Sequence, residues 1–165
     1  MNPLLHSYID ALREELKQYG EILALLDQQQ ELVVLREGTE LLESVVAVDA
    51  QAVAVQAARQ EREQRRSHLA RSLELEESSG LKELIGALPA DYQPLVQALV
   101  QENHELLVRV RQRARQNHLL LSRSVELMRR LINTFSPAVN TGTYTSNGAA
   151  RTRASSAHTF YESLG

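Results

Sequence analysis

Apolar residues near the N-terminus recur at alternating steps of four and three positions, which is the heptad spacing of a helix that packs against another helix. The row reads Leu5, Ile9, Leu12, Leu16, Tyr19, Leu23, Leu26, Gln30 and Val33. It predicts one helix over residues 4–36, in which Gln30 is the only polar member of the row. Gly38 follows as the expected C-terminal cap, and Thr39 is the expected N-cap of the next helix.

A second long helix is predicted over residues 39–77, with arginines in the middle of its row. The row reads Leu41, Val45, Val48, Ala52, Val55, Arg59, Arg62, Arg66, Leu69 and Leu73. The β-branched residues around 45–55 are also compatible with a strand, but the length of the segment and the absence of turn residues in it favour a helix. The arginines predict that the middle of the helix leaves the core, either beyond a shorter partner or against acids. We expect Arg59–Arg71 to be a solvated stretch beside Glu61 and Glu63.

The rest of the ordered part is predicted as a short helix over 81–88, which Pro89 stops, and a long helix from Pro94 to Phe135. The long helix carries a third heptad row with two asparagines. This row reads Leu99, Asn103, Leu107, Val110, Ala114, Asn117, Leu121, Ser124, Met128, Leu131 and Phe135. Asparagine at such positions fixes register or oligomeric state and lowers stability.

Residues 136–165 lose all periodicity and are rich in Ser, Thr, Ala, Asn and Gly. This composition predicts a disordered tail. Tyr144, Phe160 and Tyr161 are three of the seven aromatic residues of the chain. The tail is therefore either a contact element that folds on a partner or a plain solubilising extension. The expected fold is all-α: long antiparallel helical hairpins form a coiled-coil-like bundle over 1–135, and 136–165 is a flexible tail.

Composition supports an all-helical, soluble protein. The chain has 165 residues, 43% of them hydrophobic and 4% aromatic, with seven Gly, four Pro and no Cys. Such values are typical of long helices and exclude a disulfide framework or a thiolate site. We find no run of about 18 apolar residues and no secretory signal at the N-terminus. The expectation is a cytoplasmic protein without stable membrane insertion.

The net charge of −3 is unevenly distributed. Residues 1–49 carry a charge of −7 and residues 109–135 a charge of +6. Coulomb attraction then favours the first and last long helices as antiparallel neighbours. A nucleic-acid-binding role for the arginines of 109–135 is the rival interpretation, which the absence of interleaved aromatics disfavours.

Motifs for catalysis or for metal and cofactor binding are missing from the sequence. His104 and His118 lie about 21 Å apart along one helix and cannot share a metal. There is no Glu-x-x-His pair, no His-Glu-x-x-His motif, no phosphate loop and no dinucleotide fingerprint. We expect no enzyme activity, no metal and no cofactor, and a protein that acts by binding other proteins.

The C-terminal third resembles the FlgN family, the cytoplasmic chaperones of flagellar type III export. The resemblance rests on the segment Gln116–Leu121, on Ser124 and Val125, on Met128, Leu131 and Ile132, and on Thr143–Gly148. The opening helix rich in Leu, Glu and Gln and the break at Arg36–Gly38 are also similar. The Asn-x-x-Leu-Leu pattern (Asn117, Leu120, Leu121) and the Tyr-x-x-x-Gly element (Tyr144, Gly148) complete it. The family often has Gly directly after the tyrosine, where this chain has Thr145.

The resemblance implies binding of the hook–filament junction proteins FlgK and FlgL through their C-terminal helical segments. It also implies delivery of these clients to the export gate, whose receptor is the cytoplasmic domain of FlhA. An amphipathic client helix can lie in an apolar groove between long helices. The residues expected to bind partners are Asn117, Leu120, Leu121, Val125, Met128, Leu131, Ile132, Phe135, Tyr144 and Gly148.

Some of these apolar residues are expected to be core instead. Leu121, Met128 and Leu131 lie on the heptad row and are the main core candidates, whereas Leu120, Val125 and Ile132 lie just off it. Tyr144 is the expected gate contact. The alternative function is a self-associating coiled-coil or adaptor protein unrelated to export. The sequence leaves open whether the helices close within one chain or pair between two chains as a homodimer.

Overall fold

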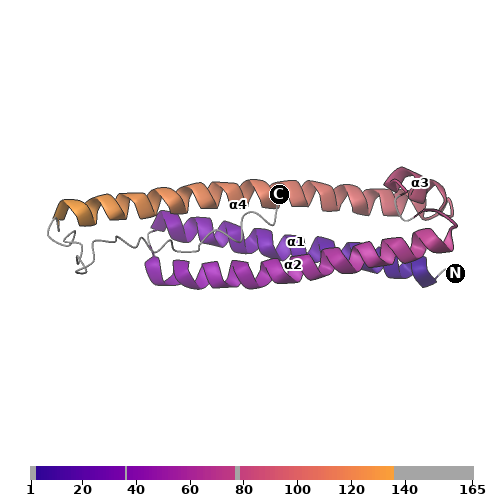
Figure 1. Cartoon of the computed structure of the whole chain (residues 1–165), viewed down its shortest axis with the longest axis horizontal. Helices are drawn as coiled ribbons and strands as arrows, with labels where there is room; N and C mark the ends of the chain where they lie inside the picture. The colour runs from indigo at the N-terminus through magenta and orange to yellow at the C-terminus, as the bar shows by residue number, and fades with distance from the viewer. Residues whose placement is uncertain (1–2, 36, 77–78, 136–165) are drawn as a thin grey trace, which may run out of the picture. The chain divides into compact units, whose positions relative to one another are not determined.

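The computed structural model describes residues 3–35, 37–76 and 79–135, and these residues form four helices and no strand (Figure 1). The helices are α1 (Pro3–Leu35), α2 (Gly38–Ser72), α3 (Leu81–Gly86) and α4 (Gln93–Phe135). The all-α prediction is confirmed. The bounds agree with the expected ones within two residues, except at the end of α2.

The chain divides into two compact units, residues 1–117 and 118–165. Helix α4 begins in the first unit, and its residues 118–135 belong to the second. The expected division into a bundle over 1–135 and a flexible tail stays a prediction, because residues 136–165 lie outside the described part.

Helices α1 and α2 form an antiparallel hairpin joined at Arg36–Glu37 (Figure 1). Side chains at matching heights of the two helices meet. The Glu15 carboxylate lies 3.1 Å from Nε of Arg62, and the Gln51 amide donates a hydrogen bond to the Gln18 side chain at 2.6 Å. This confirms the antiparallel hairpin. Thr39 lies inside α2 and does not cap it, since Glu37 is the N-cap residue and makes no side-chain capping bond.

Within the first unit, α4 runs parallel to α1. Nδ2 of Asn103 donates to the backbone oxygen of Leu12 at 3.0 Å, and Nδ2 of Asn117 donates to that of Leu26 at 2.7 Å. Residue numbers therefore rise in the same direction in both helices. The expected antiparallel pairing of the acidic first helix with the basic last helix is wrong, because antiparallel α2 has already turned the chain back.

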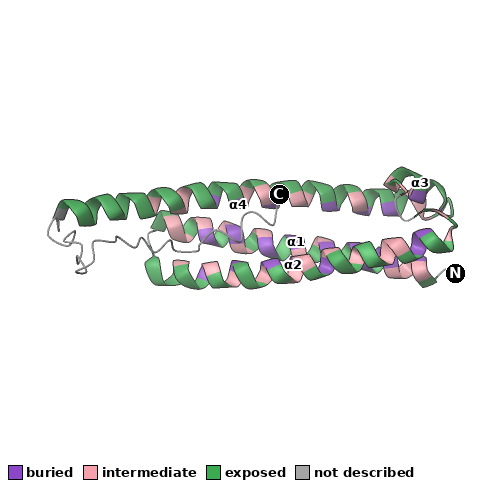
Figure 2. Ribbon diagram, in the orientation of Figure 1, coloured by how far each residue is buried: buried purple, intermediate pink, exposed green. Residues whose placement is uncertain are grey.

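The main apolar core of the first unit gathers residues from all four helices and from the α3–α4 connection. Its members are Leu5, Tyr8, Ile9, Leu12, Leu69, Ala70, Leu84, Leu88, Val96 and Leu99. Helix α3 contributes the fully buried Leu84. Gln93 is the first residue of α4. Its side-chain amide donates a hydrogen bond to the Leu88 carbonyl at 2.8 Å, which ties α4 to the segment that follows α3. Figure 2 shows the buried positions of α1 and α2 on their facing sides.

The buried face of α1 differs from the predicted row at alternate positions. It consists of Leu5, Tyr8, Ile9, Ala11, Leu12, Glu15, Tyr19, Ile22, Leu26 and Gln29. Leu16, Leu23, Gln30 and Val33 are only half-buried. The face is displaced because α1 contacts both α2 and α4, and because these neighbours supply polar partners for Glu15 and Gln29.

Helix α2 ends at Ser72, before the predicted Glu77, in a Schellman motif. The backbone N–H of Leu75 donates to the carbonyl of Ala70 at 3.0 Å, and that of Glu74 donates to Arg71 at 3.1 Å. Glu74 takes the left-handed position with φ 58°. The sequence has no Gly or Asn at this point to signal the end of the helix. The next such signal is Ser78–Gly80, and the helix was therefore predicted to continue to Glu77. Helix α3 likewise ends at Gly86, two residues before the predicted end.

By length and composition alone, α2 is the one helix in the described ranges that could cross a membrane. An 18-residue window of it has a mean hydropathy of 1.4, and 22% of that window is buried. The expectation concerned an uninterrupted run of about 18 apolar residues, whereas α2 passes on its mean hydropathy although Glu43 and Asp49 interrupt its apolar residues. One such helix is weak evidence for insertion, and this one packs antiparallel against α1.

Candidate partner-binding surface

A buried polar layer crosses the first unit at Glu15. The Glu15 residue is 4% exposed, accepts a hydrogen bond from the Tyr19 hydroxyl at 2.9 Å and forms an ion pair with Arg62. Burial raises the pKa of Tyr19 above its ordinary value, and the neighbouring Glu15 carboxylate, its hydrogen-bond acceptor, raises it further. The two charges of this group, Glu15 and Arg62, are paired with each other, as expected of a structural layer.

A cavity of about 180 Å³ adjoins this layer and is lined by α1, α2, α4 and Leu81. The buried Tyr8 hydroxyl and Oδ1 of Asn103, both on its wall, have no hydrogen-bond partner within the described protein. Burial raises the pKa of Tyr8, and Arg62 and Arg66 oppose that rise. Space of this size beside unsatisfied polar atoms suits ordered water.

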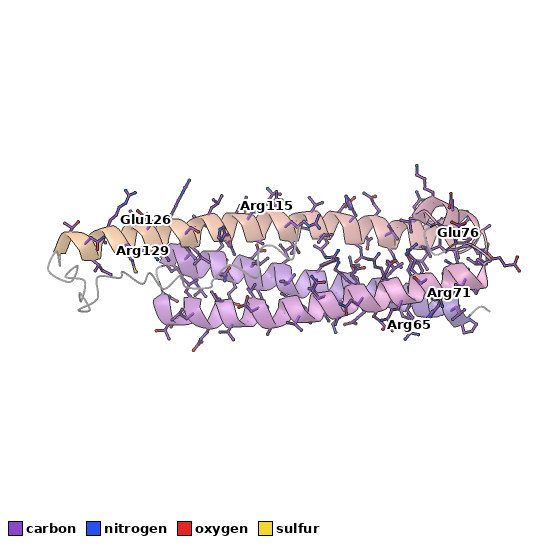
Figure 3. The ribbon with its side chains drawn as sticks, viewed as in Figure 1. Arg65, Arg71, Glu76, Arg115, Glu126 and Arg129 are labelled. Atoms are coloured by element: carbon purple, nitrogen blue, oxygen red, sulfur yellow. The ribbon has the colours of Figure 1, made fainter. Side chains whose placement is uncertain are left out.

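The arginines in the middle of α2 do not form the fully solvated stretch that the sequence suggested. Arg62 turns toward α1 and binds buried Glu15, which agrees with the expected alternative of contact with acids. Arg66 donates two hydrogen bonds to Glu63, at 2.8 and 2.6 Å, and a third to the carbonyl of Ser79 at 3.2 Å. The Arg66 hydrogen bonds lower the pKa of Glu63. Arg65, labelled in Figure 3, pairs with Glu61 one turn away.

The described part of the second unit is the last stretch of α4, and most of its apolar side chains are exposed. Exposed fractions lie between 52% and 67% for Leu119, Val125, Leu127, Met128, Leu131 and Ile132. Charged residues alternate with them: Glu126 pairs with Arg130 at 2.9 Å, and Figure 3 shows Glu126 and Arg129 on these turns. Exposed apolar side chains gathered in this way are typical of surfaces that contact other proteins.

The structure separates the predicted partner-binding residues other than Asn117 into three groups. Val125, Met128, Leu131 and Ile132 are exposed together on α4, and Leu120 and Leu121 are half-buried. Met128 and Leu131 are thus exposed, where the heptad row suggested core. Phe135 ends α4, but its side chain lies outside the described part, as do Tyr144 and Gly148.

Asn117 is not on an accessible surface. It is fully buried, and its Nδ2 donates to the Leu26 carbonyl and, at 3.0 Å, to the Gln29 side chain. This geometry matches the use of a buried asparagine to set helix register. Any effect of Asn117 on a partner would act through the bundle.

Several exposed apolar residues were missed by the sequence analysis. Leu119 and Leu127 lie among the predicted residues of α4, and Leu42, Val46 and Val53 lie on the outer side of α2. The α2 residues escaped notice because each adjoins a member of the predicted row, such as Leu41 or Val45. Their own helical spacing, beside that of the predicted row, was the signal in the sequence that could have revealed them.

In the described residues, no group of three or more His, Cys, Asp or Glu side chains could hold a metal ion.

Comparison with protein families gives one match: the model of the FlgN protein family covers residues 1–152. No curated protein and no solved structure matches the chain. The matched range includes all four helices and extends beyond α4 past Tyr144 and Gly148.

Proposed function

The chain belongs to the FlgN family of flagellar export chaperones, and from this premise we propose that it binds hook–filament junction proteins of the FlgK and FlgL type. In this proposal it holds their C-terminal helical segments in the cytoplasm and delivers them to the export gate. It acts by binding, without catalysis or a cofactor.

The observation that carries the proposal is the exposed apolar row over residues 119–132 of α4. A soluble protein leaves such a row uncovered mainly where another molecule covers it in function. Helical spacing of Val125, Met128 and Ile132 suits an amphipathic client helix laid along α4. A bound client is kept unassembled by mass action, because its assembling surface is occupied.

Tyr144 is proposed as the contact to the gate receptor, of the FlhA type, on the strength of its match to the family's tail tyrosine. A segment that orders only on binding loses entropy, which keeps its affinity modest and favours release. Client holding by α4 and gate binding by the tail can then act together or in sequence.

A pull-down from native cytosol tests this division, with residues 1–165 and 1–135 as parallel baits and mass spectrometry as the readout. We expect both baits to recover a junction protein and only the full chain to recover the gate component. Recovery of the client by the full chain alone would move the client site to residues 136–165. Recovery of no flagellar protein by either bait would contradict the proposal.

Point variants of the full chain test the two contacts separately. Tyr144→Ala should weaken gate binding and leave client binding unchanged, with Tyr161→Ala as the matched tail control. Leu131→Glu should weaken client binding, because it places a charge in the apolar row. A stable oligomer that Leu131→Glu dissociates, together with no client binding, would favour the self-associating coiled-coil alternative.

A further inference from the structure

Helix α2 has a second apolar row on its outer side, in addition to the one that faces into the first unit. The outer row consists of Leu42, Val46, Ala50, Val53 and Ala57, all exposed. The inner row consists of Ser44, Val48, Ala52, Val55 and Ala58, all buried. We call the outer row the α2 face. Its steps of four, four, three and four residues place it on one side of the helix.

The α2 face is strongly exposed for such an apolar surface. Leu42, Val46 and Val53 are 72%, 69% and 71% exposed. The most apolar window of α2 is also mostly unburied, with 22% of it covered. A helix that is apolar on two sides is normally buried on both. Within the first unit the α2 face has no cover, and Figure 2 shows much of α2 exposed.

Charges beside the face indicate what covers it. From Gly38 to Ala58, α2 carries the acids Glu40, Glu43 and Asp49 and no base. Helices that lie on membranes carry Lys and Arg beside their apolar side, and anionic lipid headgroups repel carboxylates. The same acids repel one another when two copies pair α2 against α2. A protein helix with basic residues beside an apolar stripe fits both features.

We propose that the α2 face docks a basic amphipathic helix of the client, as a second contact in addition to residues 119–132 of α4. This rests on the proposed function, because it takes the junction protein as the client. The apolar stripe of that helix packs on Leu42, Val46 and Val53, where Ala50 and Ala57 permit close approach. Its Lys or Arg side chains lie beside Glu43 and Asp49.

The test measures the affinity of purified full-length chain for a purified junction protein of the FlgK type by calorimetry. Val46→Glu and Val53→Glu should each weaken binding about tenfold or more. Val108→Glu replaces an exposed valine of α4 outside the face and should leave the affinity unchanged. Circular dichroism and urea unfolding check that each variant folds. Folding is expected because the substituted positions are exposed.

The charge component has its own variant pair. Asp49→Lys should weaken client binding several-fold at low salt, and the difference should shrink near 0.5 M salt as screening increases. Glu102→Lys exchanges an exposed acid of α4 and is the matched control. An Asp49→Lys affinity equal to wild type at all salt concentrations would overturn the basic character of the client helix.

The outcomes separate this inference from the proposed function. If the wild-type chain binds no junction protein, both fail. If it binds and the α2 variants bind equally well, only the α2 face is wrong. Light scattering that shows a wild-type dimer, dissociated by Val53→Glu, would assign the face to a second copy. Sedimentation with vesicles of phosphatidylglycerol and phosphatidylcholine, lost in Val53→Glu, would assign it to a membrane. Either result would overturn the proposal.

Discussion

Glu74 holds a backbone conformation that side chains other than glycine adopt at a cost. Its φ of 58° lies in the left-handed region, at the C′ position of the Schellman motif that ends α2. The strain is maintained by the hydrogen bonds of Glu74 and Leu75 to the last turn of α2 and by the packing of Leu75 against the core.

Glu74→Gly should therefore stabilise the protein by about 0.5–1 kcal/mol, since glycine takes this conformation freely. Urea unfolding at neutral pH measures the change. Glu76→Gly, two residues later, is the comparison, and a gain of equal size there would show that the left-handed backbone is not the cause.

Tyr19 makes the first unit sensitive to alkali. Its pKa is raised in the folded protein, so folding holds the hydroxyl neutral at pH values where the unfolded chain, with a pKa near 10.0, releases the proton. The stabilisation is complete below pH 10 and is lost as the pH rises above 10.

Tyr19→Phe should lower stability at pH 8 by about 1 kcal/mol through loss of the hydrogen bond to Glu15. It should also reduce the fall in stability between pH 9 and pH 11. Urea unfolding at these three pH values gives both quantities. A fall identical to that of wild type would contradict the role of Tyr19.

Helices α1 and α4 are held in register by buried amides. Asn117 and Gln29 are buried together and bonded to each other. Asn117→Leu should destabilise by about 1–3 kcal/mol, because it leaves the Gln29 side chain buried without that partner. The double variant Gln29→Leu, Asn117→Leu should recover most of the loss, and a double-mutant cycle by urea unfolding measures the coupling. Additive losses would mean that the two amides act independently.

The helices themselves were predictable, because long heptad rows need only one sequence to be recognised. The sequence did not predict which of two adjacent residues faces inward. Leu16 and Gln30 fit the row of α1 as well as Glu15 and Gln29 do, and hydropathy favours Leu16. The choice depends on Arg62 of α2 and Asn117 of α4, which no local pattern reveals. On α4, Met128 and Leu131 fit the heptad row and were expected in the core, but both are exposed.

At the scale of the whole molecule, charge predicted which helices meet but not their direction. Nε of Arg113 in α4 lies 2.6 Å from the Asp27 carboxylate of α1, so the basic and acidic segments do meet. The direction of α4 follows from connectivity. Because α2 already runs antiparallel to α1, α4 runs parallel to α1. The second unit begins after Asn117, where the last described hydrogen bond between α4 and α1 is made.

A fragment of residues 1–121, which keeps one further turn of α4 beyond the first unit, should fold by itself. Its thermal unfolding should be cooperative, with a midpoint close to that of the full chain, as followed by circular dichroism. A fragment of residues 1–107 lacks Asn117 and should unfold at a lower temperature. Non-cooperative unfolding of residues 1–121 would show that the rest of α4 is needed for the first unit. Under the proposed function, residues 1–121 should also lose the client contact on α4.

The two asparagine contacts bear on how chains of this kind can change length. Asn103 and Asn117 are two heptads apart in α4, and the Leu12 and Leu26 carbonyls are two heptads apart in α1. A deletion of seven residues between the asparagines returns Asn103 to a turn that faces α1, whereas a deletion of five rotates it by about 140°, toward water, and leaves a polar group mispaired. Natural insertions and deletions in this stretch of α4 should therefore come in whole heptads, a rule that sequences of related chains can be searched for directly.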